Sequence, residues 1–164
     1  MSQSISQLNE ILSSEDENRL EALVEFATSS LENGAGDDAE FKALLGASVL
    51  EIIQAGAGTG SIRVKLGEIL GTLGDPRLLT PDTTDYWTPI EDEEIHIHVG
   101  KHPVTHAEFA AFVNSDAFND DANWTPEGLA WRNSNAKSWA FLADRVDQVL
   151  VVPNQPVVGT TWFE

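Results

Sequence analysis

Apolar residues between positions 1 and 77 recur every three or four residues, the spacing of one face of an α-helix. The pattern predicts helices over residues 4–12, 14–32, 37–54 and 61–73, separated by polar or glycine-rich turns. Ser4 with Gln7, and Ser14 with Glu17, have the spacing of a capping box at the start of the first two helices. We therefore expect four short helices arranged as two helical hairpins, in the style of a helical repeat, over residues 1–77.

Beyond this region the pattern changes. Residues 78–90 are rich in Pro, Thr and Asp and predict a linker. Residues 95–99 alternate strictly between apolar and polar side chains, which predicts a half-buried strand. Pro103 then ends the extended segment, and Thr105 with Glu108 predicts a capped helix that carries Phe109 and Phe112 on one face. The sequence thus predicts an α+β protein with few short strands.

The aromatic and acidic residues after position 113 predict long loops with little regular structure, pinned by buried tryptophans. Residues 139–152 fit either a helix or a strand. An incomplete sheet near the C-terminus would leave backbone groups unpaired, so we expect either that a partner chain pairs with them there or that this is a fragment visible only within a complex.

Composition narrows the classes of function. The 27 acidic and 9 basic residues give a formal net charge of −18, and the excess is present in both halves of the chain. Such a surface repels phosphate backbones, so direct nucleic-acid binding is not expected. A basic protein partner is one interpretation of this charge, and solubility or a salt-rich cytoplasm is the other. No cysteine is present, which excludes disulfides, thiolate metal ligands and a thiol nucleophile. No apolar run is long enough for a membrane span, so we expect a cytoplasmic protein without membrane contact.

All four histidines lie between positions 96 and 106. His96, His98 and His102 are candidate metal ligands, because neutral imidazoles on one face of a strand can bind zinc. The turn at Pro103 divides the cluster, however, and ordinary surface histidines or a pH-sensitive contact explain it as well. We therefore expect no metal site.

Two other patterns have some features of a ligand-binding site, one for calcium and one for phosphate, but lack the spacing that such a site needs. Asp116, Asp120, Asp121 and Glu127 could ligate calcium but do not have the spacing of a calcium loop. The glycine-rich residues 56–61 follow a predicted helix rather than a strand, and no Lys-Ser or Lys-Thr pair follows the last glycine. A solvated loop and a plain turn are the favoured interpretations, and no cofactor or catalytic residue is expected.

The hinge GKHPVTHAEFAAFV, residues 100–113, and the closing run QPVVGTTW, residues 155–162, carry a resemblance to a known family. Together with Trp124 and the segment 128–131, they resemble the formylglycine-generating-enzyme (sulfatase-modifying factor) superfamily, whose fold is related to C-type lectins. The resemblance implies a truncated domain of this kind over residues 91–164, preceded by the helical region 1–77 and the linker 78–90.

The same resemblance implies that the family's chemistry is absent. Formylglycine-generating enzymes hold copper on paired cysteines, and their ergothioneine-type relatives bind iron partly through histidines of a preceding helical domain. This chain has no cysteine, and no histidine before His96. The resemblance therefore implies a non-enzymatic scaffold for binding, with Trp124, Trp131, Trp139 and Trp162 as candidate partner-binding residues.

Three functions remain open. The first is a regulatory or inhibitory protein that binds a partner in a bacterial conflict or antiviral defence complex, where relatives occur beside caspase-like peptidases. The second is the N-terminal fragment of a split or proteolysed enzyme of this superfamily. The third is a lectin-like module that binds a small ligand or a glycan.

Overall fold

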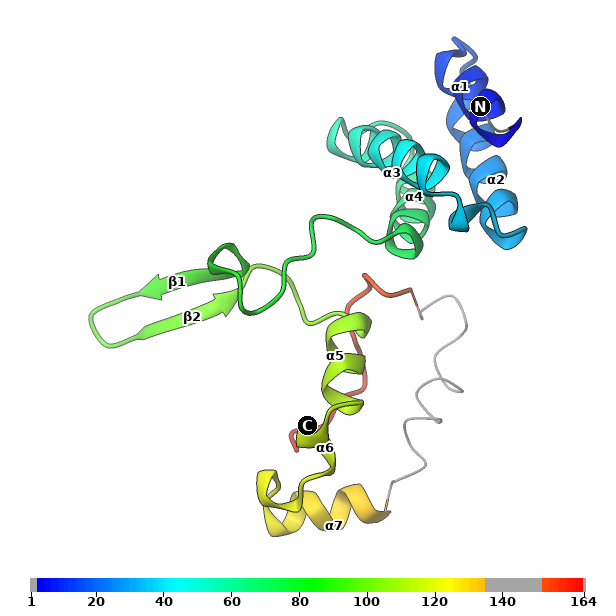
Figure 1. Cartoon of the computed structure of the whole chain (residues 1–164). Helices are drawn as coiled ribbons and strands as arrows, with labels where there is room; N and C mark the ends of the chain where they lie inside the picture. The colour runs from blue at the N-terminus through cyan, green and yellow to red at the C-terminus, as the bar shows by residue number, and fades with distance from the viewer. Residues whose placement is uncertain (1–2, 135–151, 164) are drawn as a thin grey trace. The chain divides into compact units, whose positions relative to one another are not determined.

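The computed structural model describes residues 3–134 and 152–163, and the chain divides into two compact units, Met1–Asp75 and Pro76–Glu164. Within the described residues, the first unit is helical and the second combines short helices with one two-stranded antiparallel sheet (Figure 1). The α+β class expected from the sequence is confirmed. No helix in these residues is both long and apolar enough to cross a lipid bilayer.

The first unit contains α1 (Gln3–Ser13), α2 (Arg19–Glu32), α3 (Ala39–Gln54) and α4 (Gly60–Leu73), with a short 3-10 turn η1 (Ala35–Asp37) before α3. These are the four helices that the apolar spacing predicts. Phe41 is fully buried at their centre and meets the ring of Phe26 edge-on, with ring centroids 6.1 Å apart. The other large side chains with almost no exposure come from all four helices: Leu8, Leu23, Leu45, Val49, Leu66 and Leu70.

Helix starts are set by local side-chain hydrogen bonds. The Asp38 carboxylate accepts from the N–H groups of Glu40 and Phe41 at 3.0 and 3.1 Å, which caps α3 at Asp38 rather than at Asp37, where the expected range begins. The predicted capping boxes of the first two helices are wrong. Ser4 lies inside α1, and α2 begins only at Arg19, because Asp16 accepts from the Asn18 N–H at 2.8 Å and holds residues 14–18 in a turn.

The second unit begins with a hairpin inside the expected linker. After the 3-10 turn η2 (Thr84–Tyr86), strand β1 (Trp87–Glu91) pairs antiparallel with β2 (His96–Gly100), and Ile90 lies opposite Ile97. Residues 87–90 are therefore strand rather than linker. The prediction of a half-buried strand is also wrong, because β2 is exposed along both faces except at Gly100.

The hinge after β2 has the predicted geometry. Helix α5 (His106–Val113) starts with a complete capping box, in which Thr105 and Glu108 each accept a hydrogen bond from the other's backbone N–H. Three further elements follow where loops were expected: α6 (Asp116–Asn119), η3 (Asp121–Asn123) and α7 (Pro126–Ser134). Most of the ambiguous stretch 139–152 lies outside the described residues.

The C-terminal segment pairs with the hinge of the same chain. The His106 N–H donates to the Gln155 carbonyl at 2.9 Å, and the Ala107 N–H donates to the Pro153 carbonyl at 3.0 Å. We expected a partner chain to pair with this segment. For the Pro153 and Gln155 carbonyls that expectation is wrong, because both accept hydrogen bonds from N–H groups of the same unit. The structure thus brings together the two runs that carry the family resemblance.

Candidate functional site

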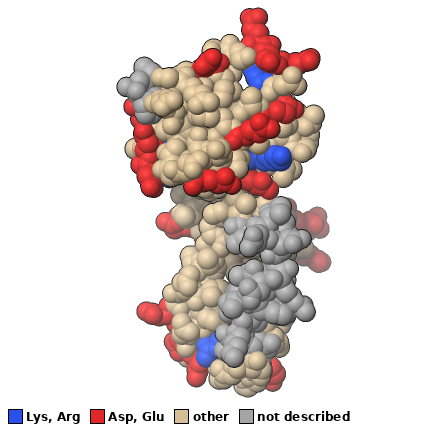
Figure 2. Space-filling model, turned by 90° about the vertical axis from the view of Figure 1, so that its right-hand side faces the viewer, with Lys and Arg blue, Asp and Glu red and all other residues tan. Residues whose placement is uncertain are grey.

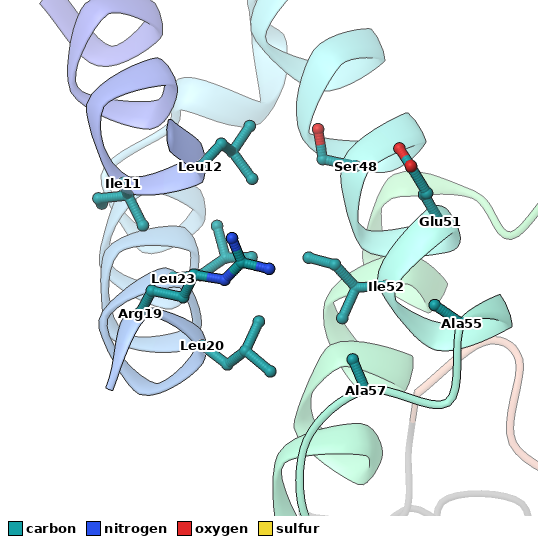
Figure 3. A pocket seen from close by; sticks show the side chains of 10 residues that line it. All are labelled: Ile11, Leu12, Arg19, Leu20, Leu23, Ser48, Glu51, Ile52, Ala55 and Ala57. Carbon is teal, nitrogen blue, oxygen red and sulfur yellow. The ribbon is translucent and has the colours of Figure 1, made fainter. Parts of the chain in front are cut away.

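An apolar groove lies between α2 and α3 in the helical unit (Figure 3). It encloses about 400 Å³, within the range of protein ligand pockets. Aliphatic side chains form most of its wall, with two charged residues and three small ones among them. The lining residues are Ile11, Leu12, Arg19, Leu20, Leu23, Ser48, Glu51, Ile52, Ala55 and Ala57.

The groove exists because the helices carry more aliphatic residues than the core can cover. Leu23 is fully buried, whereas Leu12, Leu20 and Ile52 pack against the core and remain only partly buried. Ala55 and the turn after α3 add only small side chains at that end, so nothing fills the space. A groove of this composition suits an apolar ridge of a partner, such as one face of an amphipathic helix.

Charges border the groove on both sides. In Figure 3 the Arg19 guanidinium points into the gap from α2, and Glu51 stands on α3 across from it. Arg19 also donates to the Ser14 carbonyl at 3.4 Å. The turn that joins α1 to α2 adds the exposed carboxylates of residues 15–17 beside Arg19. The lining itself therefore carries one basic and one acidic side chain, and three further carboxylates lie in the adjoining turn.

A second groove strengthens the acidic character of this unit. It lies between α2 and α4 and has Val24, Leu31 and Ile69 among its lining residues. Its charged residues are Glu25, Glu32, Lys65 and Glu68. Figure 2 shows acidic side chains spread over the helical unit, with few basic ones on the face in view. Carboxylates thus outnumber basic side chains in the lining of this second groove.

The glycine-rich residues 56–61 form most of the turn between α3 and α4 and the first two residues of α4. Arg63 donates to the carbonyls of Gly56 and Gly58 at 3.1 and 3.4 Å, and Thr59 caps α4 through the Ile62 N–H at 3.3 Å. Backbone hydrogen bonds add to these, from the Gly56 N–H to the Ile53 carbonyl at 3.0 Å and from the Ala57 N–H to the Ile52 carbonyl at 3.2 Å. The interpretation of this loop as a turn rather than a phosphate site agrees with this geometry.

The histidines are distributed over three places in the second unit. His96 and His98 lie on one face of β2, His102 lines a cavity after the strand, and His106 begins α5. Within residues 3–134 and 152–163, no group of three or more His, Asp or Glu side chains could hold a metal ion. The three candidate ligands are therefore not gathered into one site.

The candidate tryptophans have different environments. The Trp124 Nε1–H donates to the Phe118 carbonyl at 2.8 Å, and the Arg132 guanidinium lies 5.3 Å from its ring centroid. Trp131 is partly buried and packs 6.3 Å from the Phe163 ring, measured between centroids. Trp124 is likewise only partly buried, so neither of these two is as fully buried as expected, and Trp162 is 97% exposed. Trp139 lies outside the described residues.

The four acidic residues considered above as calcium ligands stabilise the local structure around α6 and α7. Asp120 accepts from the Ala122 N–H at 3.0 Å, and Asp121 pairs with Arg132. Asp116 and Glu127 lie in the first turns of α6 and α7, where a negative side chain interacts favourably with the helix dipole. Their placement agrees with a structured surface loop.

The hinge contains a carboxylate with a perturbed pKa. Burial opposes the charged form of Glu108, but the N–H and hydroxyl of Thr105, the Tyr86 hydroxyl and nearby His102 outweigh burial and lower the pKa. The hydrogen bond to Glu108 raises the pKa of Tyr86, and burial and charge repulsion from Glu108 add to that shift. Tyr86, His102 and Glu108 border a cavity of about 110 Å³, which is smaller than typical ligand pockets.

Sequence reasoning missed the groove. Its aliphatic residues have the spacing of core residues of the helices. One signal was present: the apolar stripe is broad, because it includes both Ile11 and Leu12, and a broad stripe can leave apolar side chains partly uncovered. Comparisons of the chain with family models, with curated proteins and with solved structures found no match.

Proposed function

We propose that this protein is a non-catalytic interaction protein that binds a basic, amphipathic helix of a partner protein in the groove between α2 and α3. The observation that carries the proposal is the groove's wall of aliphatic side chains, with the Glu51 carboxylate on the α3 side and the acidic residues 15–17 in the turn that precedes α2 in sequence. A bound helix would place apolar residues at helical spacing against Leu20 and Ile52, and lysines or arginines toward Glu51.

The charges on the two walls would orient the bound helix. Glu51 attracts a basic side chain to the α3 wall, whereas Arg19 repels one from the α2 wall. By holding such a segment the protein would regulate or inhibit its partner. The family resemblance favours a bacterial conflict or defence complex as the setting, with a caspase-like peptidase as one candidate partner.

A matched set of synthetic peptides tests this proposal. The peptides share leucines at helical spacing and differ only in having lysine, glutamate or glutamine at the polar positions. Binding to the full chain is measured by fluorescence anisotropy at low and high salt. We expect the lysine peptide to bind most tightly, and its affinity to fall as salt screens the charges.

Variants locate the binding site. Leu20→Ala and Ile52→Ala should each lower the affinity for the lysine peptide by about tenfold, because each removes apolar surface from the contact. Val64→Ala is the matched control, since Val64 lies on α4 with 61% of its surface exposed. Glu51→Lys should weaken binding and Arg19→Glu should strengthen it, whereas Glu10→Lys on α1 should do neither beyond its effect on net charge. Equal affinity of all peptides, or equal effects of groove and control variants, would refute the proposal.

A further inference from the structure

The hairpin of the second unit has an apolar face that stays exposed among the described residues of that unit. Because cross-strand partners point to the same side, Ile90 and Ile97 share one face, and alternation adds Val99 to it. Ile95, just beyond the end of β2, continues the same alternation. These four side chains are 42–50% exposed. A two-stranded hairpin without a covered face is marginally stable in water. Packing against a partner surface would therefore stabilise this hairpin.

The opposite face has a different character. It carries Trp87, Pro89 and Glu91 from β1, opposite Gly100, His98 and His96 from β2. Trp87 is fixed at the base, where its Nε1–H donates to the Pro81 carbonyl at 2.8 Å. The hairpin therefore has one aliphatic face and one face of mixed aromatic, polar and charged residues, and both are exposed.

The aliphatic face carries opposite charges at its two ends. Asp92 lies at the tip, where its N–H donates to the Ile95 carbonyl at 2.9 Å, and its neighbours Glu91, Glu93 and Glu94 are also acidic. Lys101 follows Val99 by two residues, on the same side of the ribbon, and its N–H donates to the Tyr86 carbonyl at 3.0 Å. No other Lys or Arg occurs in residues 87–101, so the tip is acidic and the base carries the one lysine.

This polarity makes the face complementary to itself. If two hairpins pack their aliphatic faces together in antiparallel directions, a two-fold axis places the tip of each over the base of the other. Each five-residue strand is about 17 Å long, and face-packed sheets lie about 10 Å apart, so both ends can meet at once. The arrangement covers Ile90, Ile97 and Val99 in both copies and sets Asp92 of one copy near Lys101 of the other.

We propose that the hairpin is a homodimerisation surface, in which two copies of this chain pack through their Ile90, Ile97 and Val99 faces with Asp92 and Lys101 paired across a two-fold axis. A C2 dimer is the commonest symmetric assembly, and its interface must be self-complementary, as this face is. The inference stands apart from the groove of the helical unit, and either could fail without the other.

Sedimentation equilibrium on the full chain, over a wide range of protein concentrations, tests the proposal. The wild-type protein should show a reversible monomer–dimer equilibrium. Ile97→Asp should abolish the dimer, because it buries a carboxylate at the centre of the contact. His98→Asp is the matched control, since His98 lies on the opposite face of the same strand. Circular dichroism checks that both variants keep their helical signal.

Charge exchange gives a second measurement that does not disturb the apolar face. Lys101→Asp should weaken dimerisation by about tenfold, because two exposed attractive pairs become repulsive in each dimer. Asp92→Lys should act in the same direction, and the double variant D92K/K101D should restore the wild-type dissociation constant. A wild-type protein that stays monomeric at every concentration would overturn the proposal. So would equal effects of Ile97→Asp and His98→Asp, or a double variant no better than either single one.

Discussion

The N–H of Val157 donates a hydrogen bond to the carbonyl of Val104 at 2.9 Å. This bond joins the C-terminal segment to the hinge before α5, and the bridge between Thr105 and Pro156 lies beside it. The two segments are about fifty residues apart in sequence, yet each carries one of the runs that resemble the formylglycine-generating-enzyme superfamily. The pairing makes the hinge a structural centre of the second unit, with Thr105 only 2% exposed within it.

Thr105→Ala should destabilise the second unit by about 1–2 kcal/mol, because it removes an N-cap and leaves a partly buried carboxylate without one donor. The Thr105 hydroxyl donates to the Glu108 Oε2 at 2.8 Å and accepts from the Glu108 N–H at 3.3 Å. Urea unfolding followed by tryptophan fluorescence measures the change, since all five tryptophans lie in this unit. Thr105→Ser keeps the hydroxyl and should lose much less stability; equal losses would show that the hydroxyl does not contribute.

Tyr86 is the sole tyrosine of the chain, so its ionisation can be followed alone by the near-ultraviolet absorbance of the phenolate. The hydrogen bond to Glu108 raises the pKa of Tyr86, so its titration midpoint should lie above the ordinary value of about 10. Glu108→Gln removes the negative charge and should move the midpoint back toward that value. An unchanged midpoint in the variant would remove Glu108 as the cause of the shift.

The same pair predicts how stability depends on pH. Because folding lowers the pKa of Glu108, its stabilising contribution is present above its unfolded-state pKa and is lost as the pH falls through the folded-state value. Because folding raises the pKa of Tyr86, the contribution of that residue is present below its unfolded-state pKa and is lost as the pH rises through the folded-state value. Glu108→Gln should therefore flatten the loss of stability in acid relative to the wild type.

Local side-chain signals and apolar spacing predicted the helices well where both agreed. Asp38 stands just before a clear apolar stripe, its side chain caps the helix, and α3 begins directly after it. Ser14 and Glu17 have an equally suitable spacing, but Asp16 accepts from the Asn18 N–H at 2.8 Å and competes with the helix start. The choice between two local hydrogen-bond patterns depends on how α1 and α2 pack, which sequence spacing does not contain.

The hairpin marks another boundary of sequence reasoning. Alternation correctly placed a strand near residues 95–99, but alternation cannot say whether any element covers its apolar side. Its partner β1 was missed because Pro89 and the neighbouring threonines are typical of a linker, although proline is tolerated in a strand that has a free edge. The pairing of residues 153–157 with the hinge was missed for a further reason, since no local signal reports a contact across some fifty residues.

The cap at Asp38 gives a prediction for the helical unit. Asp38→Ala should cost about 1 kcal/mol of unfolding free energy, because two N–H groups at the start of α3 lose their acceptor. The neighbouring Asp37 is exposed in η1, and Asp37→Ala should change stability by no more than about 0.5 kcal/mol. Circular dichroism in urea measures both, since α1 to α4 supply much of the helical signal. Similar losses in the two variants would assign the effect to net charge instead of capping.

Two glycines near the start of α4, Gly58 in the preceding turn and Gly60 at the first helical position, should respond in opposite directions to the same substitution. Gly58 has a φ of +82°, and an added Cβ would lie 3.0 Å from the Ile62 Cγ2 and 3.1 Å from the Leu20 Cδ1. Gly58→Ala should therefore destabilise the helical unit by at least about 1–2 kcal/mol, through backbone strain and crowding of a groove residue. Gly60 is the first residue of α4, and an added Cβ there meets nothing within 4 Å.

Gly60→Ala should accordingly stabilise the unit by about 0.4–1 kcal/mol, because alanine restricts the unfolded chain without straining the folded one. Urea unfolding followed by circular dichroism compares the two variants with the wild type under identical conditions. The lysine peptide should also bind Gly58→Ala more weakly than Gly60→Ala, since only the first substitution displaces Leu20 at the groove wall. If both alanines shift stability by the same amount and in the same direction, the turn is not held in the left-handed conformation at Gly58 that shapes this end of the groove.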